Sequence, residues 1–378
     1  MDTPPVFDVV VIGGGISGLG VLLEASLNGF SAVLLEKESL CQATSANSLR
    51  IIHGGLRYLA QLDFARIKES LQAQTEILED FSGPVKPLTC LMPLSGRGTQ
   101  HPLLAKMGAL LYRQYARYVL GRSFDVRVVS AAEAKKMASL LSAPYGALVW
   151  KDGLMEDPYE VFDAVCSKAV SCGAKVFEHC SAERVRALEP GFEVTVRQGD
   201  NRVQIHAKAV VNATGPWLFQ VGRDVRDAQA MPSTQFCLAY NVVVKKFLPE
   251  PVAMGVQNEE GRLFFAVPRG QYTALGTGYA PHTTEVGKLR VPEEELTAFR
   301  ESFIAALPHM PWELSDIVKV EAGLLPVRPN AEGEDELVGQ EELYNHEGFV
   351  DVLSTKYTTF RTQARRVIAE IRPYIVKE

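Results

Sequence analysis

The sequence lacks the cysteine patterns that mark several special classes of protein. Its six cysteines are scattered, and no two of them have the spacing of a zinc ribbon or a redox-active dithiol. In a chain of this length, scattered cysteines favour buried thiols in a reducing compartment over a disulfide framework. We therefore expect free thiols and no metal site.

Long hydrophobic runs are also scarce. Residues 9–23 are apolar but rich in glycine, lie between Asp8 and Glu24, and are too few to cross a bilayer. No basic segment precedes this run, as it would in a signal peptide. The sequence thus predicts a cytoplasmic protein, either soluble or bound at the periphery of a membrane.

An excess of positive charge is absent as well. The 378 residues include 39 basic and 45 acidic side chains, a net charge of −6, whereas a dedicated nucleic-acid binder has a basic surface. No nucleic-acid partner is therefore expected. Hydrophobic residues make up 47% and charged residues 22%, which excludes disordered and collagen-like chains. The length suggests about two or three domains.

The strongest pattern that is present lies in the first forty residues. Residues 6–12 form a β-branched apolar run that predicts a strand buried on both faces. A GGGISG turn follows at 13–18, then a helical pattern over 16–28 and a second strand over 32–35. This order is typical of a dinucleotide-binding βαβ unit.

Each part of this unit has a physical role. Gly13 permits the turn out of the strand, Gly15 lets a pyrophosphate approach the backbone, and Gly18 lets the helix pack on the sheet. The helix N-terminus directs free N–H groups at the phosphates. Glu36 follows the second strand, where a carboxylate can bind ribose hydroxyls and repels a 2′-phosphate. The predicted cofactor contacts here are Gly13, Gly15, Ile16, Ser17, Gly18, Glu36 and Lys37.

The next segments favour FAD over NAD. Residues 44–48 (TSANS) are small and polar, and such a loop can bond the diphosphate and ribityl chain. Residues 52–59 read IHGGLRYL, and the glycine pair lets the backbone pass close to a flat ring. Further on, an apolar strand ends in NATGPW at 212–217, and a strand-to-helix corner reads TKYTTFR at 355–361.

In these segments the sequence resembles the FAD-dependent glycerol-3-phosphate dehydrogenases of the D-amino-acid oxidase-like superfamily. The resemblance is carried by IHGGLRYL, NATGPW and the corner at 355–361, where Thr355 replaces the glycine of the family's GKLTTYR motif. It implies FAD as the cofactor. The further FAD contacts that it implies are Thr44, Ser45, Ser48, His53, Gly54, Gly55, Val185, Ala213, Thr214, Gly215, Trp217, Gly323, Lys356, Tyr357 and Thr358, with Val185 contacting adenine through its backbone.

The fold class that the resemblance implies is α/β (α+β in two domains). Residues 1–82, 150–232 and 320–378 would form a discontinuous, Rossmann-like FAD-binding domain. Residues 83–149 and 233–319 would form a mainly antiparallel-sheet substrate domain over the flavin. The C-terminal helical domain that many family members carry is not expected.

The implied reaction is oxidation of a small anionic secondary alcohol, similar to glycerol 3-phosphate, with hydride transfer to flavin N5. Arg57 and Tyr58 would face the substrate, and Arg57 would bind its anionic group or polarise the nascent carbonyl. His53 is the candidate base, because an imidazole exchanges protons near neutrality; a structural imidazole bonded to FAD is the alternative. Lys356 and the helix N-terminus beside it would stabilise the anionic reduced flavin.

The substrate side departs from the family pattern. Leu325 stands where the family's GxRP segment has an arginine, and Arg328 is a candidate for a second substrate clamp in its place. A histidine of the family is replaced by Tyr240 or Asn241, and a GTTD segment reads GTGY at 276–279.

Several alternatives stay open. A 2-hydroxy acid or an amino acid can replace glycerol 3-phosphate as the substrate, and a low-turnover flavin-binding protein or an NAD-dependent dehydrogenase are readings of another class. The electron acceptor is a quinone, oxygen or a partner protein. Residues 106–122 form a basic amphipathic helix, which fits either docking at a membrane surface or an ordinary solvated helix.

Overall fold

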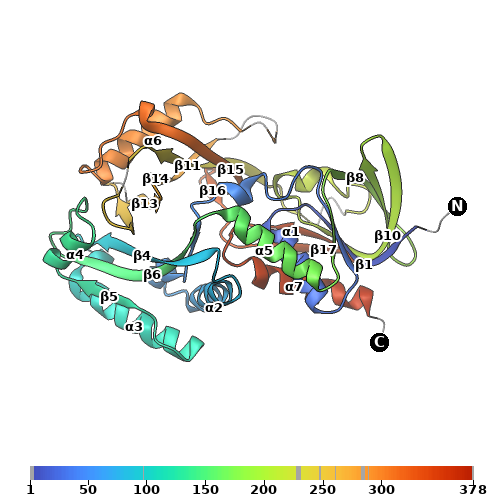
Figure 1. Cartoon of the computed structure of the whole chain (residues 1–378), viewed down its shortest axis with the longest axis horizontal. Helices are drawn as coiled ribbons and strands as arrows, with labels where there is room; N and C mark the ends of the chain where they lie inside the picture. Colours follow the sequence, from blue (N-terminus) through green and yellow to red (C-terminus); the bar gives the residue numbers. More distant parts are fainter. Residues whose placement is uncertain are drawn as a thin grey trace.

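The structure is a computed structural model, and it describes residues 4–96, 98–226, 231–246, 248–259, 261–281, 286–287 and 289–376. Two β-sheets, each covered by helices, lie next to one another along the long axis of the molecule (Figure 1). Both chain ends lie in the half that contains the first sheet.

The first sheet has eight strands in the described part of the chain. Its order is β17-β18-β10-β1-β2-β7, and β9 joins β8 to β10. The pairings among β18, β10, β1, β2 and β7 are parallel, and the others are antiparallel. The strands are β1 (Val6–Ile12), β2 (Ala32–Leu35), β7 (Lys175–Phe177), β8 (Cys180–Ala187), β9 (Phe192–Gln198), β10 (Asn201–Asn212), β17 (Glu342–His346) and β18 (Phe349–Leu353).

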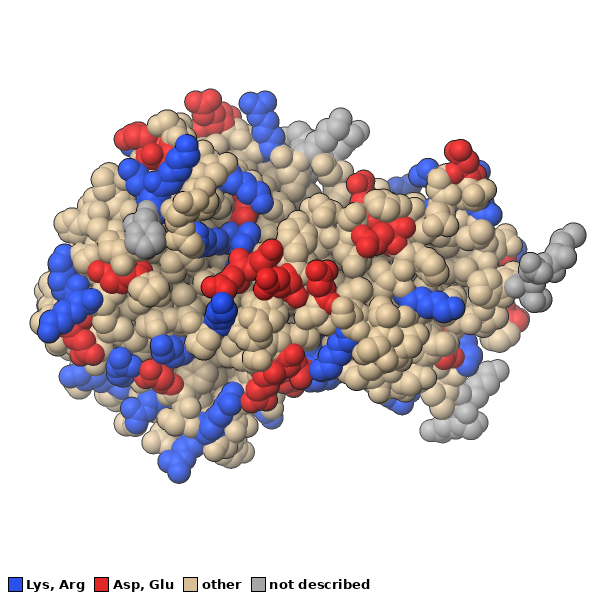
Figure 2. All heavy atoms as spheres, in the orientation of Figure 1, with Lys and Arg blue, Asp and Glu red and all other residues tan. Residues whose placement is uncertain are grey.

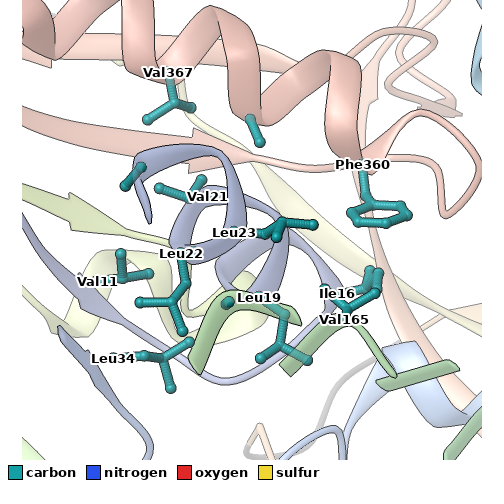
Figure 3. Packing of buried hydrophobic residues seen from close by; sticks show 14 of the residues in the cluster. Val11, Ile16, Leu19, Val21, Leu22, Leu23, Leu34, Val165, Phe360 and Val367 are labelled. Carbon is teal, nitrogen blue, oxygen red and sulfur yellow. The ribbon is translucent and has the colours of Figure 1, made fainter. Parts of the chain in front are cut away.

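Helices α1 (Ile16–Leu27), α5 (Pro158–Ser171) and α7 (Phe360–Ile375) pack on one face of this sheet. Because side chains alternate along a strand, Val9 and Val11 of β1 join this helical core, whereas Val10 and Ile12 pack against β8 and β9. Helix α1 is buried over most of its length, which explains why its sequence is apolar on every side. Figure 3 shows its side chains enclosed by the strands, α5 and α7.

Two charged side chains lie inside this apolar layer. The guanidinium of Arg361, at the start of α7, contacts Glu24 of α1 with an Nε–Oε1 distance of 2.8 Å. Both residues are buried, and Arg361 also contacts the carboxylate of Asp80 at the end of α2 (Phe64–Asp80). Arg361 therefore connects α7 to both α1 and α2.

The second sheet has ten strands among the described residues. Its order is β16-β15-β11-β14-β13-β12-β4-β6-β3, with β5 paired to β6, and only β12 and β4 pair in parallel. The strands are β3 (Ile51–Ile52), β4 (Val85–Pro93), β5 (Val126–Val129), β6 (Ala147–Met155), β11 (Gln235–Val244), β12 (Val252–Gln257), β13 (Leu263–Arg269), β14 (Tyr272–Pro281), β15 (Ile317–Pro329) and β16 (Asp335–Leu337).

Helices cover both faces of this second sheet. Helices α4 (Ala131–Met137) and α6 (Glu293–Ala306) enclose one core with strands β11 to β14, in which Phe299, Phe303 and Trp312 are fully buried. Helix α2 and α3 (Pro102–Leu120) enclose a second core with β4 and β6. Helix α3 lies at the outer edge of the molecule, far from both chain ends (Figure 1).

These two sheets confirm the predicted fold class, a Rossmann-like part and a mainly antiparallel part. The strand pairing assigns three segments differently from the predicted division of the chain. β15 pairs with β11 and therefore belongs to the second sheet, although the prediction groups residues from 320 onward with the first. β3 pairs with β6, so residues 51–52 also join the second sheet. β6 itself pairs with β4, so residues 150–155 belong there too, although the prediction starts a segment of the first domain at residue 150. Local strand patterns do not reveal the partner of a strand, which explains these differences.

Candidate active site

A cleft of about 860 Å³ lies where the two sheets meet. This is at the upper end of the range for small-molecule sites, roughly 300–1,000 Å³. One wall comes from the carboxyl ends of β1, β2 and β10. The opposite wall comes from β11, β14 and β15, and the loop before α7 closes one end. In a mostly parallel sheet, ligands bind at the carboxyl ends of the strands, so this is the expected position for a cofactor.

The glycine-rich turn after β1 is shaped by close backbone contacts. Gly13 has φ +105°, and a Cβ atom there would lie 2.7 Å from the carbonyl oxygen of Ala213. A Cβ on Gly18 would lie 1.9 Å from the carbonyl oxygen of Gly13, which no side chain can occupy. The NATG segment at the end of β10 therefore packs directly on the turn after β1, and both face the cleft.

Glu36, Lys37 and Trp217 line the cleft beside the glycine-rich turn. The carboxylate of Glu36 accepts hydrogen bonds from the backbone N–H groups of Gly14 at 2.7 Å and Glu38 at 2.8 Å. These bonds fix the carboxylate at the mouth of the turn. The Nζ atom of Lys37 lies 3.9 Å from the ring centroid of Trp217, a cation–π contact across the cleft wall.

The loop after β3 carries the His53-Gly54-Gly55 sequence at the other end of the site. The backbone N–H of Gly54 donates to Asp152 Oδ1 at 2.9 Å, and the carbonyl of Gly54 accepts from the hydroxyl of Tyr112 at 2.6 Å. The backbone N–H of His53 donates to Thr358 Oγ1 at 3.3 Å. Side chains from β6, α3 and the corner before α7 therefore hold this loop from three sides.

Asp152 is a buried carboxyl group that the sequence analysis did not identify. Besides Gly54, it accepts hydrogen bonds from Trp150 Nε1 at 2.7 Å and Gln74 Nε2 at 2.9 Å. Burial raises the pKa of Asp152, and these hydrogen bonds oppose that rise. Nothing in the local sequence marks this residue, because Gly54 and Gln74 come from distant parts of the chain, and only Trp150 is a neighbour on the same strand.

The electrostatic environment of His53 is strongly cationic. Burial, together with the positive charges of Arg57 and Lys356, lowers the pKa of His53 to about 4. The imidazole is therefore neutral at pH 7. Its Nδ1 atom is buried and has no hydrogen-bond partner among the described residues. A neutral ring with an unpaired buried nitrogen can bond a cofactor or a substrate hydroxyl.

Tyr58 lies behind these groups and is nearly buried. The cations of Arg57, Arg66 and Lys356 lie 5.5, 5.6 and 5.3 Å from the centroid of its ring. The ring therefore supports the positive charges at this end of the site rather than projecting into the cleft.

The residues predicted to hold FAD fit that group. The glycine turn leaves room for a pyrophosphate at the start of α1, and Gly15 has only the hydroxyl of Ser45 near its Cβ position, at 3.2 Å. At the far end, Thr355 Oγ1 is buried without a partner in the described part of the chain, as is His53 Nδ1. Sixteen of the predicted cofactor residues line the cleft: Gly13, Gly15, Ile16, Ser17, Glu36, Lys37, Thr44, Ser45, Ser48, Ala213, Thr214, Gly215, Trp217, Gly323, Lys356 and Tyr357.

Five other predicted cofactor residues are not among those that line the cleft: Gly18, His53, Gly54, Gly55 and Thr358. The sixth, Val185, is not among the residues that line the cleft. Its side chain lies in the core between β8 and β9, and the start of β8, residues 180–182, lines the cleft. A contact of the Val185 backbone with adenine stays a prediction.

The prediction that Arg328 is a second substrate clamp is wrong. Its guanidinium is bonded to Glu342 on β17, with an Nη2–Oε2 distance of 2.6 Å, and to the hydroxyl of Tyr344 at 3.2 Å. It lines a small surface hollow rather than the cleft. An arginine held in this way is not available as a substrate clamp, since β15 directs it to the side of β17.

Four residues of the segments that depart from the family pattern lie at the cleft. Leu325, Asn241, Thr277 and Tyr279 all line it. Asn241 donates to the carbonyl of Asn47 at 3.0 Å and accepts from the hydroxyl of Thr277 at 3.1 Å. The neighbouring Tyr240 is buried in the core. Of the two candidates for the histidine's place, Asn241 is therefore the one at the cleft.

The described residues contain no group of three or more histidine, cysteine, aspartate or glutamate side chains able to hold a metal ion. They also contain no helix that is both long and apolar enough to span a membrane.

Comparisons with known proteins agree with this geometry. A model of the family described as FAD dependent oxidoreductase matches residues 8–353. The alpha-glycerophosphate oxidase of Enterococcus casseliflavus is 27% identical over 379 residues, which cover 96% of this chain and 61% of that protein. The chain therefore spans about three fifths of the length of this relative.

Solved structures show the same fold. The glycerol-3-phosphate dehydrogenase from Bacillus halodurans, complexed with FAD, superposes with a TM-score of 0.75 at 20% identity, covering 98% of this chain and 66% of that one. The glycine oxidase from Geobacillus kaustophilus superposes with a TM-score of 0.69 at 17% identity, covering 98% and 95%. Proteins with different substrates therefore share this architecture.

Proposed function

Because the chain belongs to the family of FAD-dependent oxidoreductases, we propose that it oxidises a small anionic secondary alcohol of the glycerol 3-phosphate type. The observation that carries the proposal is the positive charge around His53, which includes Lys356 on the cleft wall. Arg57 and Lys356 act together on His53, and neither has an ion-pair partner among the described residues. Such a concentration of unpaired positive charge favours a substrate with a negative group.

FAD, when bound, supplies the acceptor for the hydride that leaves the substrate carbon. The residues that line the cleft from Gly13 to Tyr357 would hold it, with Glu36 at the ribose and the start of α1 at the diphosphate. Lys356 lies on the cleft wall and supplies a positive charge at the end opposite Glu36.

His53 is the residue that we propose accepts the hydroxyl proton. Its imidazole is neutral over the physiological range, so the ring is ready to accept a proton without first losing one. Arg57 and Lys356 favour an ionised oxygen nearby and disfavour a lasting imidazolium. The same arrangement lets Arg57 bind the anionic group of the substrate and orient its carbon.

Arg57→Gln tests the role of this cation. Loss of one charge-assisted contact should lower kcat/KM for glycerol 3-phosphate by about ten- to a hundredfold. Arg184→Gln is the control, because Arg184 is an exposed arginine on β8 that pairs with Asp224 at 2.8 Å. Equal activity of both variants would contradict the proposal for Arg57.

A second candidate substrate class is a 2-hydroxy acid or an amino acid. The observation that favours it is Leu325 on the cleft wall, where the family pattern has an arginine. One guanidinium fewer suits a carboxylate, with its single charge, better than a phosphate. The likeness to glycine oxidase adds only that the fold accommodates such chemistry.

The electron acceptor follows from where the protein resides. We propose a cytoplasmic protein in which α3 docks on an anionic membrane, where a quinone accepts the electrons. Residues 102–122 contain no acidic side chain. Large apolar side chains on this helix are exposed, including Leu103, Met107, Leu110 and Tyr118. Apolar groups beside Lys106, Arg113 and Arg117 suit the boundary between lipid headgroups and acyl chains.

Vesicle flotation tests the docking of α3. The holo-protein should float with vesicles that contain anionic lipid and remain behind with neutral ones. Met107→Glu should abolish flotation, whereas Val203→Glu, at an exposed apolar position on β10, should not. Equal flotation of both variants would contradict the assignment to α3. Oxygen or a partner protein would then be the acceptor to test.

Anaerobic mixing is the experiment that tests the reaction itself. Purified holo-protein is mixed with glycerol 3-phosphate, and the absorption of oxidised flavin is followed. Bleaching at micromolar substrate supports the proposed function. Bleaching only by a 2-hydroxy acid or an amino acid favours the second class, and no bleaching by any of them would leave a low-turnover flavin-binding protein.

A further inference from the structure

We infer that Arg262 is an anion-binding residue of this site, which takes the place of the arginine replaced by Leu325. The inference rests on the proposed function and deepens it, because it assigns the second positive charge of the substrate end. Neither the resemblance nor the local sequence pattern singles out this residue.

Arg262 directly precedes β13 and is held toward the cleft wall. Its Nη2 atom donates a hydrogen bond of 3.2 Å to the carbonyl oxygen of Thr277. Its Cζ atom lies 4.9 Å from the ring centroid of Phe264 and 5.9 Å from that of Tyr279. Thr277 and Tyr279 both line the cleft, so the guanidinium lies immediately behind its rim.

Tyr279 connects Arg262 to the predicted substrate end. Burial raises the pKa of the Tyr279 phenol, while the positive charges of Arg57 and Arg262 both act to lower it. The two arginines come from different parts of the chain, and both are near this one side chain. Tyr279 is 43% exposed, which leaves its ring accessible from the cleft.

The charge of Arg262 is uncompensated in the described part of the chain. It forms no ion pair there, whereas Arg269, at the other end of β13, pairs with Glu321 at 2.7 Å. One N–H of the guanidinium donates to the carbonyl of Thr277, which is its protein acceptor among the described residues. The remaining donors are free to bind an anion, and a guanidinium can engage two oxygens of a phosphate at once.

Two guanidinium groups near Tyr279 favour a phosphate ester over a carboxylate. A phosphate carries up to two negative charges and three terminal oxygens, enough for Arg57 and Arg262 together. Leu325, on the neighbouring wall, then supplies only apolar surface. The substrate class that follows is a small phosphorylated secondary alcohol.

The test is anion binding to the holo-protein. Inorganic phosphate is titrated into wild-type protein and into Arg262→Gln, and the shift of the flavin spectrum gives the Kd. Arg262→Gln should weaken phosphate binding by about ten- to a hundredfold, and Arg262→Lys should recover part of the loss. In turnover, KM for glycerol 3-phosphate should rise while kcat changes little, as for a contact made equally in ground and transition states.

Arg127→Gln is the matched control, because Arg127 is an exposed arginine of the same sheet, on β5, and pairs with Asp125. An unchanged Kd and KM in Arg262→Gln would overturn the inference, even where wild-type protein is reduced by glycerol 3-phosphate. Failure of the proposed function is distinct. Wild-type protein would then not be reduced by the substrate, while phosphate binding would still report on Arg262.

Discussion

The phenol of Tyr112 donates a hydrogen bond of 2.6 Å to the carbonyl oxygen of Gly54 and so connects α3 to the loop that carries His53. Tyr112 is completely buried on the inner side of the helix, opposite the exposed apolar residues. A single hydrogen bond thus links the helix that we propose binds a membrane to the loop that we propose binds substrate.

Tyr112→Phe removes that bond and leaves the buried carbonyl of Gly54 without its donor. We expect a loss of about 1–3 kcal/mol in the free energy of unfolding. We also expect a lower kcat, because the backbone at His53 is less well held. Chemical denaturation and steady-state kinetics measure the two effects.

Tyr115→Phe is the matched control for this substitution. Its hydroxyl donates to the carbonyl of Phe64 at 3.0 Å, so it makes the same kind of bond from the same helix but not to the loop. Tyr115→Phe should cost stability and leave kcat near the wild-type value. A similar fall of kcat in both variants would show that the effect is not specific to the loop.

The depressed pKa of His53 predicts a pH dependence of stability for the apoprotein. The unfolded chain takes up this proton near pH 6.5, whereas the folded chain takes it up only near pH 4. Between these values the unfolded state binds more protons, so the free energy of unfolding falls as the pH drops. The loss should reach up to about 3 kcal/mol at the acid end. Denaturation at a series of pH values measures it.

His53→Gln should flatten that slope, because glutamine does not titrate. In the wild-type holoenzyme, kcat/KM should stay level as the pH falls through 6.5 and decline only toward pH 4. If the free energy of unfolding of His53→Gln still falls as the pH drops below 6.5, the titration belongs to another group.

Gly18→Ala should disrupt cofactor retention. The added methyl group would lie 1.9 Å from the carbonyl oxygen of Gly13, so α1 must move away from the turn that faces the cleft. We expect protein purified with little or no flavin and destabilised by about 1–3 kcal/mol. The ratio of flavin to protein absorbance is the measurement. Gly83→Ala, where no atom lies within 4 Å of the new carbon, should retain flavin as the wild type does.

Arg361→Met should be severely destabilising. It removes the buried cation that Glu24 and Asp80 share, and leaves Glu24 with the more exposed Arg365 at 3.4 Å and Asp80 with Lys168 at 3.1 Å. Loss of the buried partner costs up to about 3–5 kcal/mol. Thermal unfolding measures the change. The double variant Glu24→Met/Arg361→Met should recover part of the stability, since it also removes the stranded charge. If the double variant is less stable than the single variant, packing and not charge dominates at this position.

The sequence was most informative where the functional residues are close together in the chain. The turn at 13–18, Glu36 and the segment at 213–217 are local motifs, and their residues lie along one cleft. Buried strands and an amphipathic helix are equally local patterns, but the two-domain fold class was implied by the resemblance to a known family. Helix α3 begins at Pro102, a little before the predicted start, because His101 caps it.

Residues whose roles depend on distant partners were not predictable. Asp152 holds the loop at Gly54 together with Gln74, and both of these partners are far from it in the sequence, so no local motif identifies it. Arg328 was misplaced because its partner Glu342 lies on a strand of the other sheet. Tyr240 and Asn241 could not be separated until the pairing of β11 with β14 fixed which of them faces the cleft.

The packing of Gly13 on Ala213 has a consequence for how the protein is made. β1 is synthesised early, but its neighbour β10 follows some two hundred residues later, and the loop that closes the cleft is later still. Such non-local pairings form slowly, since the intervening chain must first be ordered. The nascent chain therefore has no complete binding cleft until residue 357 has left the ribosome. We therefore expect cofactor capture to be a late step in biosynthesis, and we expect a product truncated before residue 353 to lack the segment that closes one end of the cleft.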